Sequence, residues 1–306
     1  MQKIRHSDQH AAAPANMRAR PFFTPSFDED QIALRQVRAD PRSALCTIVG
    51  IDGSFSRRLG AQLAIAPGGG TFGSLSDGCL EKELAAQALA RKVLGNGPAC
   101  LRFGKGSPFI DFRLPCGSGL DILLDPDPRP DAIREAVGRL DRRLPASLQL
   151  AVHRSDLMRR RDYIPSLRLV ICGAGPEAEW LATLAASLGV AAVVVGPGKG
   201  LHLHQSPDWL QLDEWTAVTL LFHDHEWERA ILEWALASDA FYVGAMGGKK
   251  ARESRHALLA ASGVGEDQIA RVRSPIGMIR QTRDARLLAL SVLSEIALNY
   301  EGLRPC

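Results

Sequence analysis

The chain of 306 residues lacks long apolar runs and any strong excess of charge. Residues 1–23 contain no apolar run of signal-peptide length, and glycine interrupts the later apolar runs well short of the roughly 20 residues that span a membrane. The formal net charge is only +3, which does not by itself indicate a nucleic-acid or membrane partner. We therefore expect a cytoplasmic protein with neither kind of partner.

Cysteine pairs with the spacing of metal or redox motifs are also missing. The six cysteines include no Cys-x-x-Cys pair, and no histidine cluster has zinc-finger spacing. A disulfide scaffold is not expected in a cytoplasmic chain of this size, and free cysteine is among the most buried residue types. We accordingly predict core positions for Cys46, Cys100 and Cys172, and a free terminal thiol for Cys306. Only Cys79 and Cys116 have local settings that leave a ligand role open.

The order of the expected elements indicates two domains of an α/β protein. After an irregular leader over residues 1–27, short strands and amphipathic helices predict a mixed α+β domain over 28–153. Residues 154–166 contain a run of arginines and are expected to form a solvated linker. Over residues 167–306 strands alternate with helices, which predicts a Rossmann-like domain with an open parallel sheet.

The stretch GSLSDGCLEKEL, residues 73–84, joins a turn of small residues to a helix predicted over 79–94. Asp77 or Ser76 could cap this helix, and Glu81 would favour its first turn electrostatically. A thiol in that first turn, as at Cys79, faces unpaired amides and the positive end of the helix dipole, which favour the thiolate. Thiolate suits a soft or borderline metal. Packing in the core remains the alternative for Cys79.

Two further features of the same half could act with this turn. Cys116 lies in the glycine loop PCGSG before a strand and is either a second sulfur ligand or a core residue. Arg57 and Arg58, in the loop SFSRRLG, offer two cations.

A glycine turn opens the second half. In VICGAGPEA, Gly173, Gly175 and Ala178 have the G-x-G-x-x-[GA] spacing between a strand and a helix, where backbone amides can bind an anion. A dinucleotide site should also have an acidic residue roughly 20 positions later, to bind the ribose. The sequence there is GPGKG, so NAD(P) binding is not expected.

Two other polar turns follow strands of this half. Gly247 precedes Lys249 at the start of a helix whose first turns carry cations, which indicates either an anionic ligand or exposed surface lysines. The run HDH, residues 223–225, has metal-capable side chains. Adjacent residues do not converge on one ion without a sharp turn, so polar loop residues are the favoured interpretation.

Together these stretches resemble the XdhC/CoxI family, accessory proteins of molybdenum hydroxylases such as xanthine dehydrogenase. The family's GS-x-SGGC-x-E signature matches GSLSDGCLE, and its PCGG loop matches LPCGSG. Its GAGH, YVGALGS and PIGL motifs match GAGP, FYVGAMGG and SPIGM. The resemblance runs from about residue 44 to 297. It departs from the pattern at Asp77, where the family has glycine, and at Pro176, where it has histidine.

The resemblance implies a carrier and chaperone, rather than an enzyme, for the molybdenum cofactor in its molybdopterin or mononucleotide form. Such a protein shields the cofactor, supports its sulfuration and inserts it into a hydroxylase of the xanthine dehydrogenase or aldehyde oxidase type. A cysteine desulfurase would be a further partner, and a homodimer is expected. The residues expected to bind the cofactor are Cys79 as metal ligand, with Cys116, Ser76, Asp77, Gly78, Glu81, Arg57, Arg58, Gly173, Gly175, Gly247 and Lys249.

Two alternatives stay open. A nucleotide-dependent oxidoreductase could use the Rossmann-like half, because its first glycine turn has suitable spacing. A scaffold could instead dock a desulfurase onto the hydroxylase without holding the cofactor.

Overall fold

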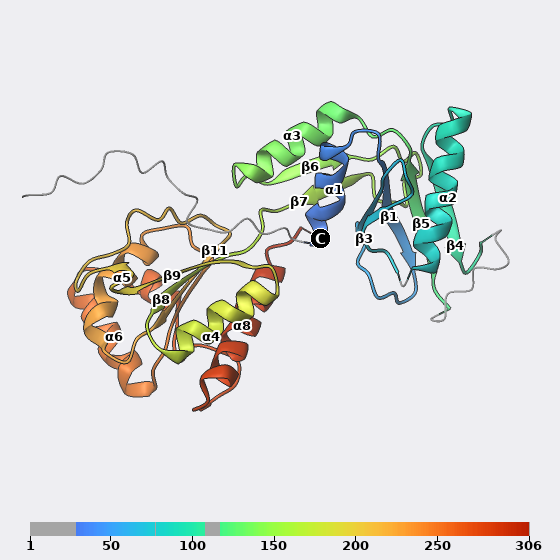
Figure 1. Cartoon of the computed structure of the whole chain (residues 1–306). Helices are drawn as coiled ribbons and strands as arrows, with labels where there is room; N and C mark the ends of the chain where they lie inside the picture. Colours follow the sequence, from blue (N-terminus) through green and yellow to red (C-terminus); the bar gives the residue numbers. More distant parts are fainter. Residues whose placement is uncertain (1–28, 77, 108–116, 306) are drawn as a thin grey trace, which may run out of the picture.

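The computed structural model describes residues 29–76, 78–107 and 117–305. The first domain is built on an antiparallel sheet of five strands in the order β3-β2-β1-β5-β4 (Figure 1). Its strands are β1 (Ala44–Asp52), β2 (Gln62–Ile65), β3 (Thr71–Gly73), β4 (Ala99–Gly104) and β5 (Gly119–Asp125). The central strand β1 has an almost fully buried pattern, because helices cover both faces of the sheet.

Each face of this sheet has its own apolar core. Helix α2 (Cys79–Leu94) packs Leu80, Leu84 and Ala88 against one face, which includes Cys46 and Ile48 of β1. Helices α1 (Glu29–Ala39) and α3 (Pro130–Asp141) cover the opposite face. The alternation of side chains along the strands divides the apolar residues between these two layers.

The stretch expected as a solvated linker contains a strand. Strand β7 (Arg160–Tyr163) pairs antiparallel with β6 (Ala146–Gln149), and the side chains of Arg161 and Tyr163 are buried. The Tyr163 hydroxyl donates a hydrogen bond to Oε1 of Gln62 at 2.7 Å. The prediction of a solvated linker is therefore wrong for residues 160–163, since the charged sequence of this segment hides a strand packed on the first domain.

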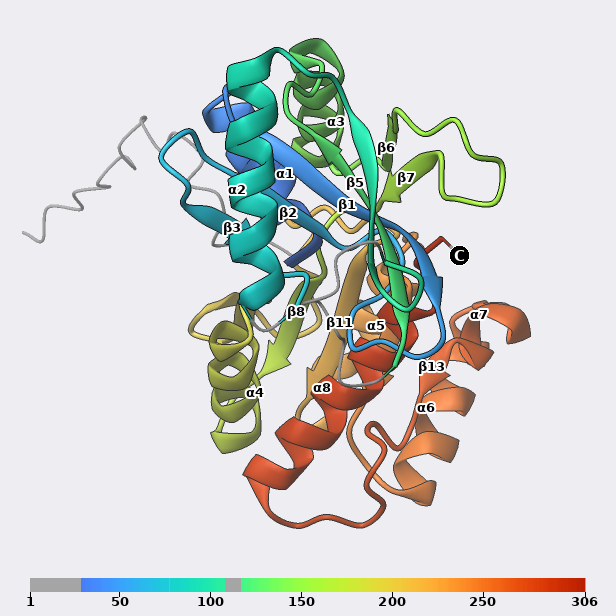
Figure 2. The same ribbon diagram turned by 90° about the vertical axis from the view of Figure 1, so that its right-hand side faces the viewer.

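The second domain has a parallel sheet of six strands in the order β10-β9-β8-β11-β12-β13. The strands are β8 (Arg168–Gly173), β9 (Ala191–Pro197), β10 (Gly200–Leu201), β11 (Thr216–Leu221), β12 (Tyr242–Ala245) and β13 (Val272–Arg273). The helical elements are α4 (Pro176–Ser187), η1 (His225–Trp227), α5 (Glu228–Leu236), α6 (Lys249–Ala261), α7 (Glu266–Ala270) and α8 (Ala285–Glu301). Helices α4 and α8 pack on one face, with α6 on the other side of the sheet (Figure 2). The α/β class and the Rossmann-like second domain are thereby confirmed.

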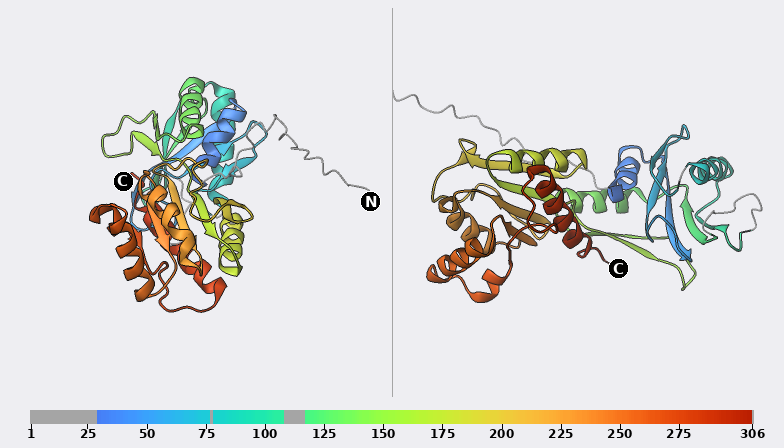
Figure 3. Two further views of the ribbon diagram at one scale, coloured as in Figure 1. Left: turned by 90° about the vertical axis from the view of Figure 1, so that its left-hand side faces the viewer. Right: turned by 90° about the horizontal axis from the view of Figure 1, so that it is seen from below.

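The two domains lie side by side and meet around one carboxylate, that of Asp30 in α1 (Figures 1 and 3). Arg58 and Arg304 bind its Oδ2 atom, and Nη2 of Arg161 lies 3.2 Å from Oδ1. Burial raises the pKa of Asp30, but the three guanidinium groups outweigh it and hold this pKa below its ordinary value. A second ion pair, Arg143 with Asp213 at 2.8 Å, also joins the two domains.

None of the helices within the described ranges combines the length and the apolar character that crossing a bilayer requires.

Candidate functional site

The turn before α2 is shaped by glycine. The helix begins at Cys79, and its N-cap is Gly78, whose φ of 104° lies in the region that favours glycine. The prediction that Ser76 or Asp77 caps the helix is thus wrong for Ser76, while Asp77 lies outside the described residues. The chain reaches the first turn of α2 through a backbone conformation that a side chain would strain.

Glu81 organises this turn more than the dipole argument predicted. Its buried carboxylate accepts hydrogen bonds from the amides of Leu75 at 2.9 Å, Ser76 at 2.5 Å and Gly78 at 2.8 Å. Hydrogen bonds to a charged acceptor are stronger than neutral ones. The turn therefore has its own internal anion, and these three amides are occupied.

The two neighbouring arginines have different positions. Arg57 donates a hydrogen bond to Oγ of Ser74 at 3.0 Å, and Ser74 donates in turn to the carbonyl of Ser76 at 2.9 Å. Arg57 therefore lies at the turn that precedes Cys79. Arg58 instead binds Asp30 and Glu301 at the domain junction, so the structure brings only one of the two cations to the turn.

The Cys79 side chain is exposed at the first position of α2, which sets the core-packing alternative aside. Cys46 and Cys172 are buried in strands as predicted, and burial raises the pKa of both thiols. The core prediction for Cys100 is wrong, because this residue lies on the edge strand β4 and is exposed. Its neighbours Leu101 and Phe103 take the face that packs on the core. Cys116 and Cys306 lie outside the described residues.

In the second domain, both predicted glycine turns lie at the carboxyl edge of the sheet. A Cβ on Gly173 would lie 2.6 Å from the carbonyl oxygen of Leu221, so only glycine fits between these strands. Gly175, with φ of 90°, is the N-cap of α4. Gly247, with φ of 125°, precedes α6, whose first residue Lys249 is exposed and lies 3.8 Å from Glu253.

The three side chains of the HDH run, residues 223–225, make different contacts. Asp224 caps η1 by accepting a hydrogen bond from the amide of Glu226 at 3.0 Å. Nδ1 of His225 lies 3.1 Å from Oε1 of Glu228, and Nε2 of His223 lies 3.7 Å from Glu177. No cluster of three metal-capable side chains occurs in residues 29–76, 78–107 and 117–305.

A cavity of about 950 Å³ opens at this carboxyl edge, which we call the Rossmann crevice. Its walls come from Glu177 in the first turn of α4, from the turns after β11 and β12, and from residues 275–285. They include Gly247 and Lys249, whereas the predicted Gly173 and Gly175 do not line the cavity. Arg280 and Arg283, which also line this wall, were not predicted from the sequence. Their signal was the basic run IRQTRDAR, whose arginines flank the start of α8.

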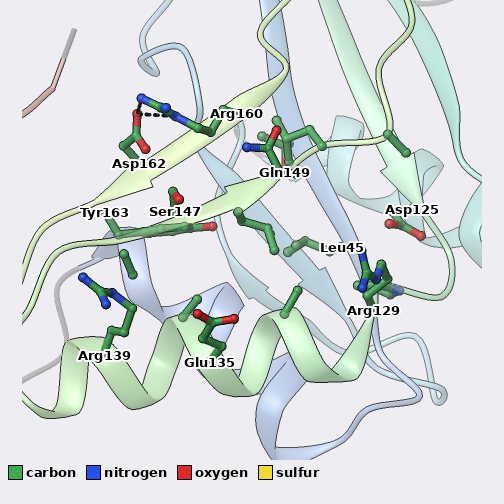
Figure 4. Close-up of a pocket in the computed structure, with 18 of the residues that line it drawn as sticks. Leu45, Asp125, Arg129, Glu135, Arg139, Ser147, Gln149, Arg160, Asp162 and Tyr163 are labelled. Atoms are coloured by element: carbon green, nitrogen blue, oxygen red, sulfur yellow. Dashed lines mark hydrogen bonds and ion pairs between the residues drawn. The ribbon is translucent and has the colours of Figure 1, made fainter.

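A second cavity, of about 1050 Å³, lies in the first domain between α3, the β6–β7 hairpin and the sheet (Figure 4). Glu135 and Arg139 extend into it from α3, and Ser147 and Gln149 lie on its opposite wall. None of the predicted site residues that the structure describes lines it.

The turn at Cys79 and the Rossmann crevice do not meet within one chain. Helix α8 contributes Ala285 and Leu288 to the crevice at its beginning, and Glu301 at its end reaches Arg58 at the domain junction. Its 17 residues span about 25 Å, so the beginning of α8 lies about that far from the junction, at the end of the second domain that faces away from the first (Figure 1). The structure therefore does not bring the predicted residues together. Arg57, Ser76, Gly78, Cys79 and Glu81 lie at the turn before α2 or at its start, Gly247 and Lys249 line the crevice, and Arg58 lies at the domain junction.

Two family models match this chain, each in one of its two domains. The family model described as the XdhC Rossmann domain matches residues 169–296, and that of the XdhC and CoxI family matches residues 36–104. The chain is 31% identical over 282 residues to the molybdenum cofactor insertion chaperone PaoD of Escherichia coli K12, covering 87% of this chain and 86% of that one. A crystal structure described as a xanthine dehydrogenase from Bacillus halodurans has a TM-score of 0.69 at 17% identity, covering 91% of this chain and 97% of that chain, which shows a shared fold.

Proposed function

The chain belongs to the XdhC and CoxI family, and from this premise we propose that it is a carrier that binds the molybdenum cofactor and delivers it to a molybdenum enzyme. The observation that carries the proposal is the exposed thiol of Cys79 at the start of α2, in a turn that Glu81 and Arg57 hold in place. A carrier needs its ligand groups accessible and fixed before the cargo arrives, since ordering them on binding reduces affinity.

The donor groups at this turn fit an anionic cargo with a soft metal end. The molybdenum cofactor is a phosphorylated pterin dithiolene, so it offers a metal for a thiolate and polar edges for hydrogen bonds. Cys79 would approach the metal, and Arg57 would supply positive charge nearby. The N-cap Gly78 has no side chain to bind the amides at the start of α2, whereas the amides of Ser76 and Gly78 donate hydrogen bonds to Glu81.

The finer steps follow the same reasoning. The protein would shield the cofactor and support its sulfuration by a cysteine desulfurase. It would then insert the cofactor into a hydroxylase of the xanthine dehydrogenase or aldehyde oxidase type. A thiol that binds the metal end reversibly suits a carrier, because the cargo must leave again. We propose that the protein acts as a chaperone in the cytoplasm, as a homodimer, and does not turn over a small substrate.

Cofactor retention tests this proposal directly. The purified full chain is mixed with anaerobically released molybdenum cofactor, separated by gel filtration, and assayed by reconstitution of a cofactor-free nitrate reductase. The wild-type protein is expected to retain cofactor, and Cys79→Ser to lose most of it. Cys100→Ser is the matched control, because Cys100 is also an exposed thiol but lies on β4. Equal retention by the wild type and Cys79→Ser, or none by either, would overturn the proposal.

A further inference from the structure

The Rossmann crevice lies where the order of the parallel strands reverses. From β8 the chain passes to β9 on one side, and it then returns to β11 on the other side of β8. Ligands of open α/β sheets bind outside the carboxyl ends of the strands at such a point. Its volume of about 950 Å³ is also within the range of small-molecule sites.

One wall of the crevice is basic and lacks acidic partners. Arg252, Arg280 and Arg283 line it, are exposed, and make no side-chain ion pair with the residues that the structure describes. Oδ1 of Asp284 accepts hydrogen bonds from the amides of Arg286 and Leu287, at 2.8 and 3.0 Å. Uncompensated cations around one cavity attract an anionic ligand.

An acidic side chain, Glu177, lies at the point where the strand order reverses. Oε2 of Glu177 is buried and has no hydrogen-bond partner among the described residues, while Oε1 lies 3.7 Å from Nε2 of His223. Buried polar atoms nearly always have a partner, so this oxygen is an acceptor for a donor supplied by a ligand. A sugar hydroxyl or a base amino group has the required donor.

Between these ends the crevice has an apolar lining. Ile276 is buried, whereas Met278 and Ile279 are 56% and 46% exposed although they line a cavity. Apolar side chains that flank a few convergent polar groups are typical of sites for flat heterocycles. The crevice therefore combines a place for a phosphate, an apolar contact for a ring and an acceptor for a hydroxyl or amine.

The walls are held by hydrogen bonds before any ligand arrives. Arg255 makes two hydrogen bonds to the buried carboxylate of Glu228, at 2.9 and 3.0 Å, and donates to the carbonyl of Met246 at 2.8 Å. On the other side, the amide of Gly277 donates to Glu295 at 2.6 Å. A cavity formed in advance avoids the cost of ordering its loops on binding.

The crevice does not extend to the residues that follow β9. Residues 198–201, which follow β9 and would contact the second half of a dinucleotide, do not line it. We propose that the Rossmann crevice binds a single ribonucleotide, with its phosphate beside Arg252, Arg280 and Arg283 and its sugar or base donor on Glu177. The ligand is either a free nucleotide or the nucleotide part of the cofactor, and only the second source rests on the proposed function.

Isothermal titration calorimetry on the full chain tests this site with CMP, GMP, NADH and inorganic phosphate as probes. A mononucleotide is expected to bind at least tenfold more tightly than phosphate, and NADH no more tightly than the mononucleotide. Since a charge-assisted contact is lost, Arg252→Ala and Arg280→Ala should each weaken mononucleotide binding about tenfold. Arg134→Ala, which removes a surface arginine of α3 outside the crevice, should leave it unchanged.

Three results would overturn the site: no binding of either mononucleotide at millimolar concentration, equal binding of phosphate and mononucleotide, or equal binding by the arginine variants and the wild type. Cys79→Ser should bind the mononucleotide like the wild type, so a failure of cofactor retention and a failure of this site give different results. Displacement of bound mononucleotide by the nucleotide form of the cofactor would identify the cofactor as the source. Persistence of the bound mononucleotide would identify a free nucleotide.

Discussion

The carboxylate of Glu81 accepts a hydrogen bond from the amide of Gly78 at 2.8 Å, so the third residue of α2 closes back on the residue that caps the helix. The same carboxylate takes up the amides of Leu75 and Ser76. The buried side chain of Glu81 thus stabilises the turn that presents Cys79, together with the contact of Arg57 with Ser74, and no bound anion is needed for it.

Replacement of Glu81 by alanine should therefore destabilise the first domain. Three amides lose a charged acceptor in a buried place, and we expect the free energy of unfolding to fall by about 2 to 4 kcal/mol. Urea unfolding followed by circular dichroism measures this. Glu83→Ala is the control, since Glu83 only accepts a hydrogen bond from Gln87 on the helix surface, and should change the value by less than about 0.5 kcal/mol. Similar losses in both variants would contradict the role of Glu81.

Alkylation should distinguish the cysteines by exposure. In the native protein iodoacetamide is expected to modify Cys79 and Cys100 and to spare Cys46 and Cys172, because the thiolate must be accessible to react. Peptide mass spectrometry reads each site. Bound molybdenum cofactor should then protect Cys79 and leave Cys100 reactive. Protection of both thiols, or of neither, would show that the cofactor does not bind specifically at the turn before α2.

Periodicity predicted the regular elements well, and the neighbours of the site less well. The helix expected over residues 79–94 is α2 with the same bounds, because small turn residues and apolar spacing are local signals. Strand β7 was missed, because its arginines suggest solvent. The burial of Arg161 depends on Tyr163, with the guanidinium 5.0 Å from the ring centre, and on Asp30, which is distant in sequence.

The site residues show the same limit. Arg57 and Arg58 are adjacent in sequence, yet one contacts Ser74 at the turn and the other Asp30 at the domain junction. Which partner each of two adjacent arginines contacts depends on the tertiary structure and cannot be predicted from local sequence. Cys100 was placed in the core because free cysteine is usually buried, but an edge strand with one covered face leaves every second side chain exposed.

The carboxylate of Asp30 should make the junction between the domains sensitive to acid. Its pKa is held below the ordinary value, so its contribution to stability is present above the unfolded-state pKa of about 4 and is lost as the pH falls through the lower folded-state value. Asp30→Asn should lower the free energy of unfolding at pH 7 by about 3 kcal/mol, since three arginines lose their shared partner.

Urea titrations over a series of pH values test this dependence. The difference between the wild type and Asp30→Asn should shrink as the pH falls below about 4, because the carboxyl of the unfolded chain is protonated there before that of the folded protein. Asp131→Asn is a suitable control, because Asp131 pairs with Arg134 on the surface with 81% of its side chain exposed. A difference that stays constant with pH would show that the charge of Asp30 does not stabilise the junction.

The buried pair of Glu228 and Arg255 should support the Rossmann crevice as a unit. Both side chains are only 3% exposed, and Arg255 also holds the carbonyl of Met246 beside Gly247. Arg255→Met leaves a buried carboxylate with His225 as its remaining neighbour, so we expect a loss of about 3 to 5 kcal/mol in the free energy of unfolding. Glu228→Gln leaves the guanidinium without its charged partner and should cost a similar amount.

The double variant should be less destabilised than the sum of the two single changes, because no isolated charge remains. A double-mutant cycle by urea unfolding gives the coupling free energy, and additive losses would mean that the two side chains act independently.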